Sequence, residues 1–217
     1  MFRVAVLASG SGSNLQALID KLHRKVADIE IALVLSDRPG ALALERAERA
    51  DIPTAVFPPD AYPTREAHDL ALAEAVETAD VSLVVLAGYM RLLGPAFLDR
   101  FPWRVINLHP ALLPSFPGVD GIGDAIRYGV KVTGVTVHFV DQGVDTGPII
   151  RQECLPVHDR DTVTSLAERI HALEHRVLPR TVELMATGRV KPPRPGERRV
   201  FVDDSAPGFV EGQDFGR

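Results

Sequence analysis

Residues 2–22 read FRVAVLASGSGSNLQALIDKL. The apolar run over residues 2–8 is typical of a buried strand, and the glycine- and serine-rich continuation is typical of a loop. Leucine and isoleucine then recur over residues 15–22 at a spacing that places them on one face of a helix. A strand, a tight loop and a helix in this order form the first unit of an α/β fold.

The same alternation continues along the chain. Further strands are expected at residues 29–35, 54–57, 81–86 and 104–108, with helices between them at 41–50, 65–78 and 94–100. These strands are apolar on both faces, which predicts a parallel sheet covered by helices on both sides. Residues 133–140 and 149–157 have no helix between them and predict an antiparallel pair. A long helix over 161–186, interrupted or bent near Pro179, closes the pattern.

The predicted fold class is therefore α/β, with an open, doubly wound, mostly parallel, Rossmann-like sheet and an antiparallel strand pair in the C-terminal half. We expect a single domain over residues 1–188. The Pro/Gly-rich remainder, 189–217, is expected to be a peripheral C-terminal tail in which residues 200–202 form one more edge strand.

Composition and charge exclude several classes of protein. Of the 217 residues, 46% are hydrophobic and 24% charged, which is usual for globular enzymes and not for disordered or fibrous chains. A net charge of −5 offers no electrostatic basis for binding nucleic acid or an anionic membrane. The single cysteine, Cys154, excludes an internal disulfide, and no Cys/His spacing predicts a metal. Without a signal-peptide pattern or an apolar run of about 18 residues, a cytoplasmic protein is expected.

The loop over residues 9–14 predicts an anion site, in particular for a phosphate. Gly10 and Gly12 allow positive φ and close approach of a ligand, and the N–H groups at the start of the following helix favour negative charge. Ser13 with Gln16 also fits a capping box, which would be a purely structural role. The loop lacks the Gly-Lys-Ser/Thr of a Walker motif. Leu15 replaces the third glycine of the dinucleotide fingerprint, so Asp37, at the end of the second strand, supports a nicotinamide site only weakly.

The segment over residues 105–110, VINLHP, predicts a catalytic pair. Asn107 and His109 are two residues apart in a strand and therefore share a face, and Pro110 places them at the carboxyl edge of the sheet. An Asn amide can stabilise an oxyanion, and a His can transfer a proton near neutral pH. An acid is needed to orient the imidazole, and the pattern alone does not choose among Asp120, Asp141 and Asp145.

Five segments together resemble the phosphoribosylglycinamide formyltransferases, a branch of the folate-dependent formyltransferase superfamily. In chain order they are GSGSNLQ (10–16), AGYMRLL (87–93), NLHPALLP (107–114), GVTVHFV (134–140) and DTGPI (145–149). The resemblance covers about residues 3–188. It implies the formyltransferase version of the Rossmann-like fold and transfer of the formyl group of 10-formyltetrahydrofolate to the amine of glycinamide ribonucleotide in purine synthesis.

The resemblance also assigns roles to individual residues. The phosphate of the ribonucleotide is expected on Gly12, Ser13 and Asn14, and its ribose hydroxyls on Glu174. The catalytic residues are expected to be Asn107, His109 and Asp145. The folate is expected to contact the backbone from Val140 to Asp145 and the side chains or backbone of Arg65, Met90, Arg91, Leu92 and Leu93. The implied chemistry is direct amine attack through a tetrahedral intermediate, with no covalent enzyme intermediate and no metal, in a monomer or homodimer.

One departure from the family pattern stands after Pro117-Gly118-Val119, where the family carries a His and this chain carries Asp120. Asp120 is expected either to place a carboxylate near the substrate amine or to cap the helix that contains Asp124. Among the other histidines, His138 is expected to have a packed, hydrogen-bonded core role. The rest are expected on the surface: His23, His68, His158, His171 and His175.

Alternative functions use parts of the same motifs. A 10-formyltetrahydrofolate hydrolase would use the same Asn-His-Asp trio but is expected to carry an extra N-terminal domain, whereas this sequence begins at the first strand. Formyl transfer to initiator tRNA would need a C-terminal nucleic-acid-binding domain. A non-catalytic nucleotide-binding module would use the glycine loop alone and would keep its ligand affinity without Asn107 or His109. A nicotinamide-dependent reductase is disfavoured by the missing third glycine.

Overall fold

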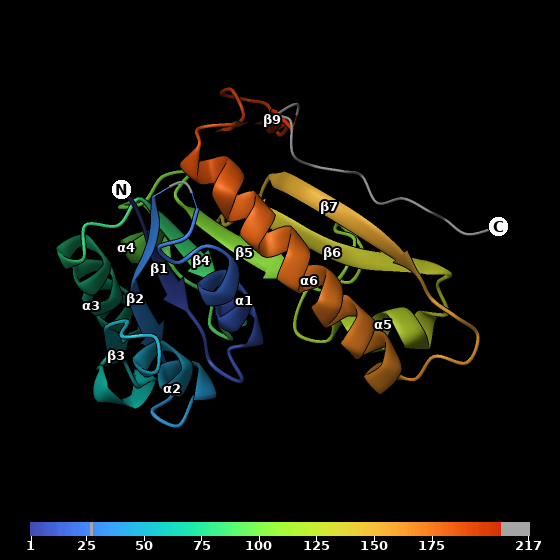
Figure 1. The fold of residues 1–217 in the computed structure, drawn as a ribbon, viewed down its shortest axis with the longest axis horizontal. Coiled ribbons are helices and arrows are strands. Elements are labelled where there is room, and N and C mark those ends of the chain that lie inside the picture. The colour runs from blue at the N-terminus through green and yellow to red at the C-terminus, as the bar shows by residue number, and fades with distance from the viewer. Residues whose placement is uncertain (27, 205–217) are drawn as a thin grey trace.

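The computed structural model describes residues 1–26 and 28–204, and its centre is a seven-stranded sheet (Figure 1). The strand order across the sheet is β3-β2-β1-β4-β5-β6-β7. The strands span Phe2–Leu7 (β1), Ile29–Ser36 (β2), Thr54–Val56 (β3), Leu83–Leu86 (β4), Val105–His109 (β5), Val132–Phe139 (β6) and Ile149–Pro156 (β7). Strand β4 begins two residues later than predicted, and the carbonyls of Val81 and Ser82 just before it accept hydrogen bonds from the Arg104 side chain.

The register of the sheet confirms the predicted fold class. Strands β1 to β5 pair in parallel, whereas β5 with β6 and β6 with β7 pair in antiparallel fashion. Because β2 and β4 flank β1 on opposite sides, the chain direction across the sheet reverses between β1 and β4. In open α/β sheets, ligands bind in the crevice outside the carboxyl ends of the strands at such a point.

Helices cover both faces of the sheet, as predicted from strands apolar on both sides. They span Ser13–Lys21 (α1), Leu42–Glu48 (α2), Arg65–Thr78 (α3), Pro95–Leu98 (α4), Gly121–Tyr128 (α5) and Val163–Ala186 (α6), with a 3-10 turn at Pro59–Ala61 (η1). One apolar core lies between the sheet and α1, α2 and α6, and a second lies between the sheet and α3 and α4 (Figure 1).

Helix α6 runs through Pro179 without the expected interruption. Proline has no backbone N–H, so the carbonyl of His175, four residues earlier, loses its usual helical partner. The Lys21 side chain at the end of α1 donates a hydrogen bond of 2.7 Å to this carbonyl. A tertiary contact therefore replaces the missing helical bond and holds α1 against α6.

The C-terminal strand pairs differently from the prediction. Phe201–Val202 (β9) forms a separate two-stranded antiparallel ribbon with Val190–Lys191 (β8) and is not an edge strand of the main sheet. Gly196, with a φ of 83°, lies in the turn that brings the two strands together. Val190 is buried in the core that faces α6. Residues 205–217 of the predicted tail lie outside the described part of the chain, and the expected domain boundary at residue 188 stays a prediction.

Candidate active site

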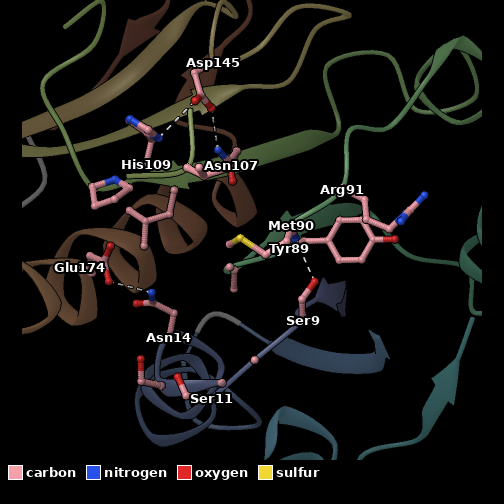
Figure 2. Close-up of a pocket in the computed structure, with 18 of the residues that line it drawn as sticks. Ser9, Ser11, Asn14, Tyr89, Met90, Arg91, Asn107, His109, Asp145 and Glu174 are labelled. Atoms are coloured by element: carbon pink, nitrogen blue, oxygen red, sulfur yellow. Dashed lines mark hydrogen bonds and ion pairs between the residues drawn. The ribbon is translucent and has the colours of Figure 1, made fainter. Parts of the chain in front are cut away.

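A cleft of about 520 Å³ opens at the carboxyl edge of the sheet, at the β1/β4 switch point (Figure 2). Its lining comes mainly from the segments that follow β1, β4 and β5, and the β6–β7 loop and helix α6 contribute further residues. Residues from distant parts of the sequence therefore meet here because parallel strands end at one edge. The cleft brings together most of the predicted site residues: Gly12, Ser13, Asn14, Met90, Arg91, Leu92, Asn107, His109, Asp145 and Glu174.

The glycine loop lines the cleft, and helix α1, which follows it, begins there without a side-chain cap. Gly12 is the N-cap residue of α1 with a φ of 69°, and a Cβ there would lie 2.6 Å from the Cα of Ala43, so only glycine fits. No side chain caps this described helix, and the capping box expected from Ser13 and Gln16 is not formed. The first N–H groups of α1 are thus left for an anion.

Glu174 of α6 faces the same loop. The Asn14 side chain donates a 2.9 Å hydrogen bond to its Oε2, and the Glu174 side chain is only 5% exposed. Burial raises the pKa of this carboxyl, against the opposing effects of the Asn14 hydrogen bond and the nearby His171. The arrangement gives the phosphate loop a neighbouring acceptor for hydroxyl groups (Figure 2).

Asn107, His109 and Asp145 form a compact cluster on the other side of the cleft (Figure 2). The Nδ1 atom of His109 lies 3.3 Å from Oδ2 of Asp145, and the Asn107 amide lies 3.3 Å from its Oδ1. Asn107 and His109 lie on β5, as the two-residue spacing predicted, and Asp145 lies in the loop between β6 and β7. Asp145 has a φ of 53°, a conformation that Asp tolerates better than most residues.

The surroundings of Asp145 keep its carboxylate charged. Burial alone would raise its pKa, but a hydrogen bond from His138, the Gly118 N–H and the charge of His109 together lower it. The Gly118 N–H donates to Oδ2 at 2.8 Å. A charged carboxylate at this position accepts a hydrogen bond from an imidazole N–H and so orients the His109 ring.

His109 has both ring nitrogens against oxygen acceptors. Its Nε2 donates a 2.8 Å hydrogen bond to the carbonyl of Phe116, while Nδ1 faces Asp145. Because a carbonyl only accepts, Nε2 carries a hydrogen in this arrangement, and an imidazolium satisfies both contacts. The loop from Phe116 to Gly118 is therefore tied to the catalytic cluster at two points.

His138 is buried and hydrogen-bonded, as predicted, but its contacts belong to the site. Its Nε2 lies 3.2 Å from the Asn107 amide nitrogen and 3.6 Å from Oδ1 of Asp145. Its Nδ1 donates to the carbonyl of Phe139 at 2.8 Å. Sequence reasoning missed this proximity because His138 stands directly opposite Asn107 in the antiparallel β5–β6 pair, a register that local patterns do not reveal.

The segment after β4 forms the wall expected to contact folate. A smaller cavity of about 70 Å³ adjoins the cleft, and its lining includes the predicted residues Leu93 and Val140 together with Asn107 and Asp145. Arg65 lines neither cavity. Its side chain is 52% exposed at the start of α3, 3.8 Å from the carboxylate of Asp69. The expected contact of Arg65 with folate thus stays a prediction.

Asp120 takes the capping role that the sequence offered as one of two alternatives. It is the N-cap of α5, accepts a hydrogen bond from the Gly123 N–H, and pairs with Arg127 at 2.8 Å. It does not line the cleft. Both carboxylate oxygens of Asp120 thus accept hydrogen bonds from groups within α5, as expected of a helix cap.

Three histidines expected on the surface have more specific places. His68 is buried at 2% exposure, with its Nε2 3.0 Å from the Phe57 carbonyl, and His23 accepts a hydrogen bond from the Ile31 N–H. His171 is exposed but lines the cleft one helical turn before Glu174. In the first two cases a buried ring nitrogen pairs with a backbone group, the carbonyl of Phe57 after β3 for His68 and the N–H of Ile31 in β2 for His23.

Within residues 1–26 and 28–204, no cluster of three or more His, Cys, Asp or Glu side chains is arranged to hold a metal ion. No helix in that same part of the chain has the length and apolar character needed to cross a membrane.

Comparison with known proteins gives the family. The family model described as "Formyl transferase" matches residues 2–182. Phosphoribosylglycinamide formyltransferase of Bacillus subtilis is 44% identical over 183 residues, which cover 84% of this chain and 94% of that protein. The trifunctional purine biosynthetic protein adenosine-3 of Homo sapiens is 44% identical over 87% of this chain, which corresponds to 19% of its own length.

A solved structure gives the same result at the level of the fold. Glycinamide ribonucleotide transformylase 1 from Symbiobacterium toebii superposes with a TM-score of 0.90 at 48% sequence identity, covering 94% of this chain and 95% of that one. Both identity and coverage are far above what a shared fold alone would produce. The chain therefore belongs to the phosphoribosylglycinamide formyltransferase branch of the formyl transferase family.

Proposed function

We propose that this protein transfers the formyl group of 10-formyltetrahydrofolate to the amine of glycinamide ribonucleotide, which yields formylglycinamide ribonucleotide for purine synthesis. One observation carries the proposal: a single cleft holds both an uncapped helix start suited to a phosphate and the Asn107–His109–Asp145 cluster. A phosphorylated acceptor bound at one end would present its far end to the cluster at the other.

The phosphate end is built from backbone. Gly12, Ser13 and Asn14 supply N–H groups at the start of α1, where the helix dipole adds to their attraction for an anion. Glu174 lies beside them and accepts hydrogen bonds, which suits the ribose hydroxyls of a ribonucleotide. An adjacent carboxylate also disfavours an acceptor that lacks hydroxyl donors at this position.

The formyl donor would occupy the wall formed by Met90, Arg91, Leu92 and Leu93 and the adjoining cavity that reaches Val140. Apolar side chains beside backbone polar groups suit a flat heterocycle that needs both stacking and hydrogen bonds. Arg65 lines neither cavity but lies beside Gly94, which follows this wall, and would contact the folate from there. The Asp145 loop lines the same cavity, so the donor's formyl group would come to lie next to the catalytic cluster.

The chemistry follows from the charges of the cluster. The acceptor amine attacks the formyl carbon, forms a C–N bond and leaves an oxyanion on the formyl oxygen. A protonated His109 stabilises that oxyanion, and the ionised Asp145 at 3.3 Å stabilises the imidazolium. When the intermediate collapses, the bond from carbon to N10 breaks, and N10 takes up a proton while the amine loses one, through His109 or an ordered water.

Asn107 would supply the second donor to the oxyanion. Its amide nitrogen lies 3.3 Å from Asp145 and 3.2 Å from His138, both long for hydrogen bonds. Hydrogen bonds to a charged acceptor are stronger than those to an uncharged one, so a developing negative charge on the formyl oxygen draws one amide hydrogen toward the reacting atoms. Catalytic hydrogen bonds commonly tighten in this way only once substrate is bound.

The folate is a co-substrate and the mechanism uses no metal, nucleic acid or membrane. A cytoplasmic location and a monomeric or homodimeric state stay predictions.

A spectrophotometric assay with 10-formyltetrahydrofolate, run with and without glycinamide ribonucleotide, tests the proposal. Folate product that appears only in the presence of the ribonucleotide supports the transferase. Equal deformylation without the ribonucleotide would mean that water is the acceptor and that the protein is a hydrolase. Ligand binding without turnover in either mixture would favour the non-catalytic nucleotide-binding module.

A further inference from the structure

Ser9 lies between the two predicted substrate subsites, at the point where the glycine loop leaves β1. It is 3% exposed, and its N–H and its hydroxyl both contact the segment that follows β4. The Ser9 N–H donates to the Gly88 carbonyl at 3.0 Å, and the Ser9 hydroxyl oxygen accepts from the Met90 N–H at 2.9 Å (Figure 2). Neither the sequence motifs nor the reaction chemistry assigns this serine a role.

The side chain is needed because the β1–β4 ladder ends here. The Ala87 N–H still donates to the Leu7 carbonyl at 2.9 Å, but Gly88 has a φ of 75° and turns the chain away from β1. The Met90 N–H then has no strand partner and would be a partly buried, unpaired donor without the Ser9 hydroxyl. The hydroxyl therefore extends the ladder by one bond into the folate wall.

The other end of the same segment is tied in a similar way. The Gly94 N–H donates a buried 2.8 Å hydrogen bond to the carboxylate of Asp69 on α3. Residues 90–93 thus lie between two backbone N–H groups that are held by side chains, the Met90 N–H by Ser9 after β1 and the Gly94 N–H by Asp69 on α3. Asp69 has no contact with the glycine loop among the bonds described, whereas Ser9 is continuous with it through Gly10.

We propose that Ser9 is a positioning residue that holds the folate wall in register with the phosphate loop and so couples the binding of the two substrates. An anion bound to the N–H groups of the loop contacts the segment that carries Ser9, and the Ser9 hydroxyl joins that segment to the Met90 backbone. By linkage, folate binding then favours ribonucleotide binding by the same factor. This inference rests on the proposed function for the identity of the two ligands.

Ser9→Ala tests the proposal, because it removes one oxygen and leaves the backbone bond to Gly88 in place. The KM for 10-formyltetrahydrofolate should rise about fivefold, the size expected for one lost hydrogen bond, while kcat changes less than twofold. The Met90 amide should exchange its hydrogen faster, with the amides of β6 unchanged. The Kd of a folate analogue without a transferable formyl group should no longer fall when glycinamide ribonucleotide is added.

Thr181→Val is the matched control, since Thr181 also uses a buried hydroxyl in a 2.8 Å bond to backbone, but inside α6. It should lower thermal stability without moving the folate KM. An unchanged folate KM in Ser9→Ala, or an equal rise in Thr181→Val, would overturn the proposal. If the wild-type protein transfers formyl groups, such a result refutes only the role of Ser9; absence of transfer in the wild type refutes the proposed function instead.

Discussion

Asp145→Asn isolates the charge that the proposed chemistry requires. The substitution keeps the size of the side chain and the acceptor oxygen for the Gly118 N–H, but it removes the negative charge 3.3 Å from Nδ1 of His109. At that distance, and with an effective dielectric constant of about 20, a unit charge pair is worth about 5 kcal/mol. This energy is an upper bound on the electrostatic stabilisation that the imidazolium loses in the variant.

A loss of about 5 kcal/mol in the transition state corresponds to a rate reduction of roughly three to four powers of ten. Proton transfer by a positioned side chain contributes about 10²–10⁴-fold in enzymes generally. We therefore expect kcat to fall by about 10²–10⁴-fold, with smaller changes in KM for either substrate, because Asp145 acts through His109 on a charge that exists only in the transition state.

The assay is steady-state formyl transfer, with thermal unfolding of the same preparations. Asp159→Asn is the matched control, because Asp159 also has a lowered pKa but pairs with Lys131 on the surface and lies outside the cleft. It should leave turnover unchanged. Retention of more than about a tenth of the wild-type kcat by folded Asp145→Asn would refute the electrostatic role.

The lowered pKa of Asp145 also predicts a pH dependence of stability. Because the folded state holds the charged form more strongly than the unfolded state, its contribution is present above the ordinary pKa of Asp. That contribution is lost as the pH falls through the lowered value. Asp145→Asn should thus unfold at a lower temperature than wild type at neutral pH, and the difference should shrink in acid. A constant difference at every pH would contradict this account.

Three further predictions concern stability and packing. Burial raises the pKa of Glu174, so the folded protein loses stability as the pH rises through that raised pKa. Glu174→Gln should therefore melt at a higher temperature than wild type at neutral pH, at the same temperature as wild type at a pH below the ordinary pKa of Glu, and should bind the ribonucleotide more weakly. A difference in melting temperature that is the same at every pH would refute the assignment. Phe97→Ala should reduce the free energy of unfolding by about 3–5 kcal/mol in urea titrations, because Phe97 is fully buried under the folate wall, and a loss below about 1 kcal/mol would contradict that packing. Gly134→Ala would place a Cβ 2.0 Å from the Glu153 carbonyl, so the β6–β7 pair must separate; circular dichroism and denaturation as in wild type would show that pairing to be wrong.

Most of the parallel half of the fold could be predicted because its signals are local. The apolar runs of β1, β2 and β5 and the periodic faces of α1 and α3 appear within single windows of sequence. The β8–β9 ribbon could not be predicted in the same way. It depends on a turn near Gly196 and on pairing between two strands of two residues each, which carry almost no pattern.

In the candidate site, too, the features with a local signal could be predicted and those that depend on tertiary structure could not. Asn107 and His109 could be placed on one face from their spacing alone. The acid could not be chosen from the pattern, because the choice depends on how the loop after β6 returns: Asp145 faces His109, whereas Asp141 binds Gly143 and Thr146 within its own turn. The proximity of His138 depends on antiparallel register, which is set by the whole sheet and not by the residues around it.

The fate of the formyl group tests the central claim most directly. We would incubate the protein with 10-formyltetrahydrofolate labelled with ¹³C in the formyl carbon, add glycinamide ribonucleotide, and follow the label by NMR. We expect the carbon signal to move from the folate to an amide of the ribonucleotide, at a rate that Asp145→Asn strongly reduces. Release of the label as formate at the same rate with or without the ribonucleotide would contradict it.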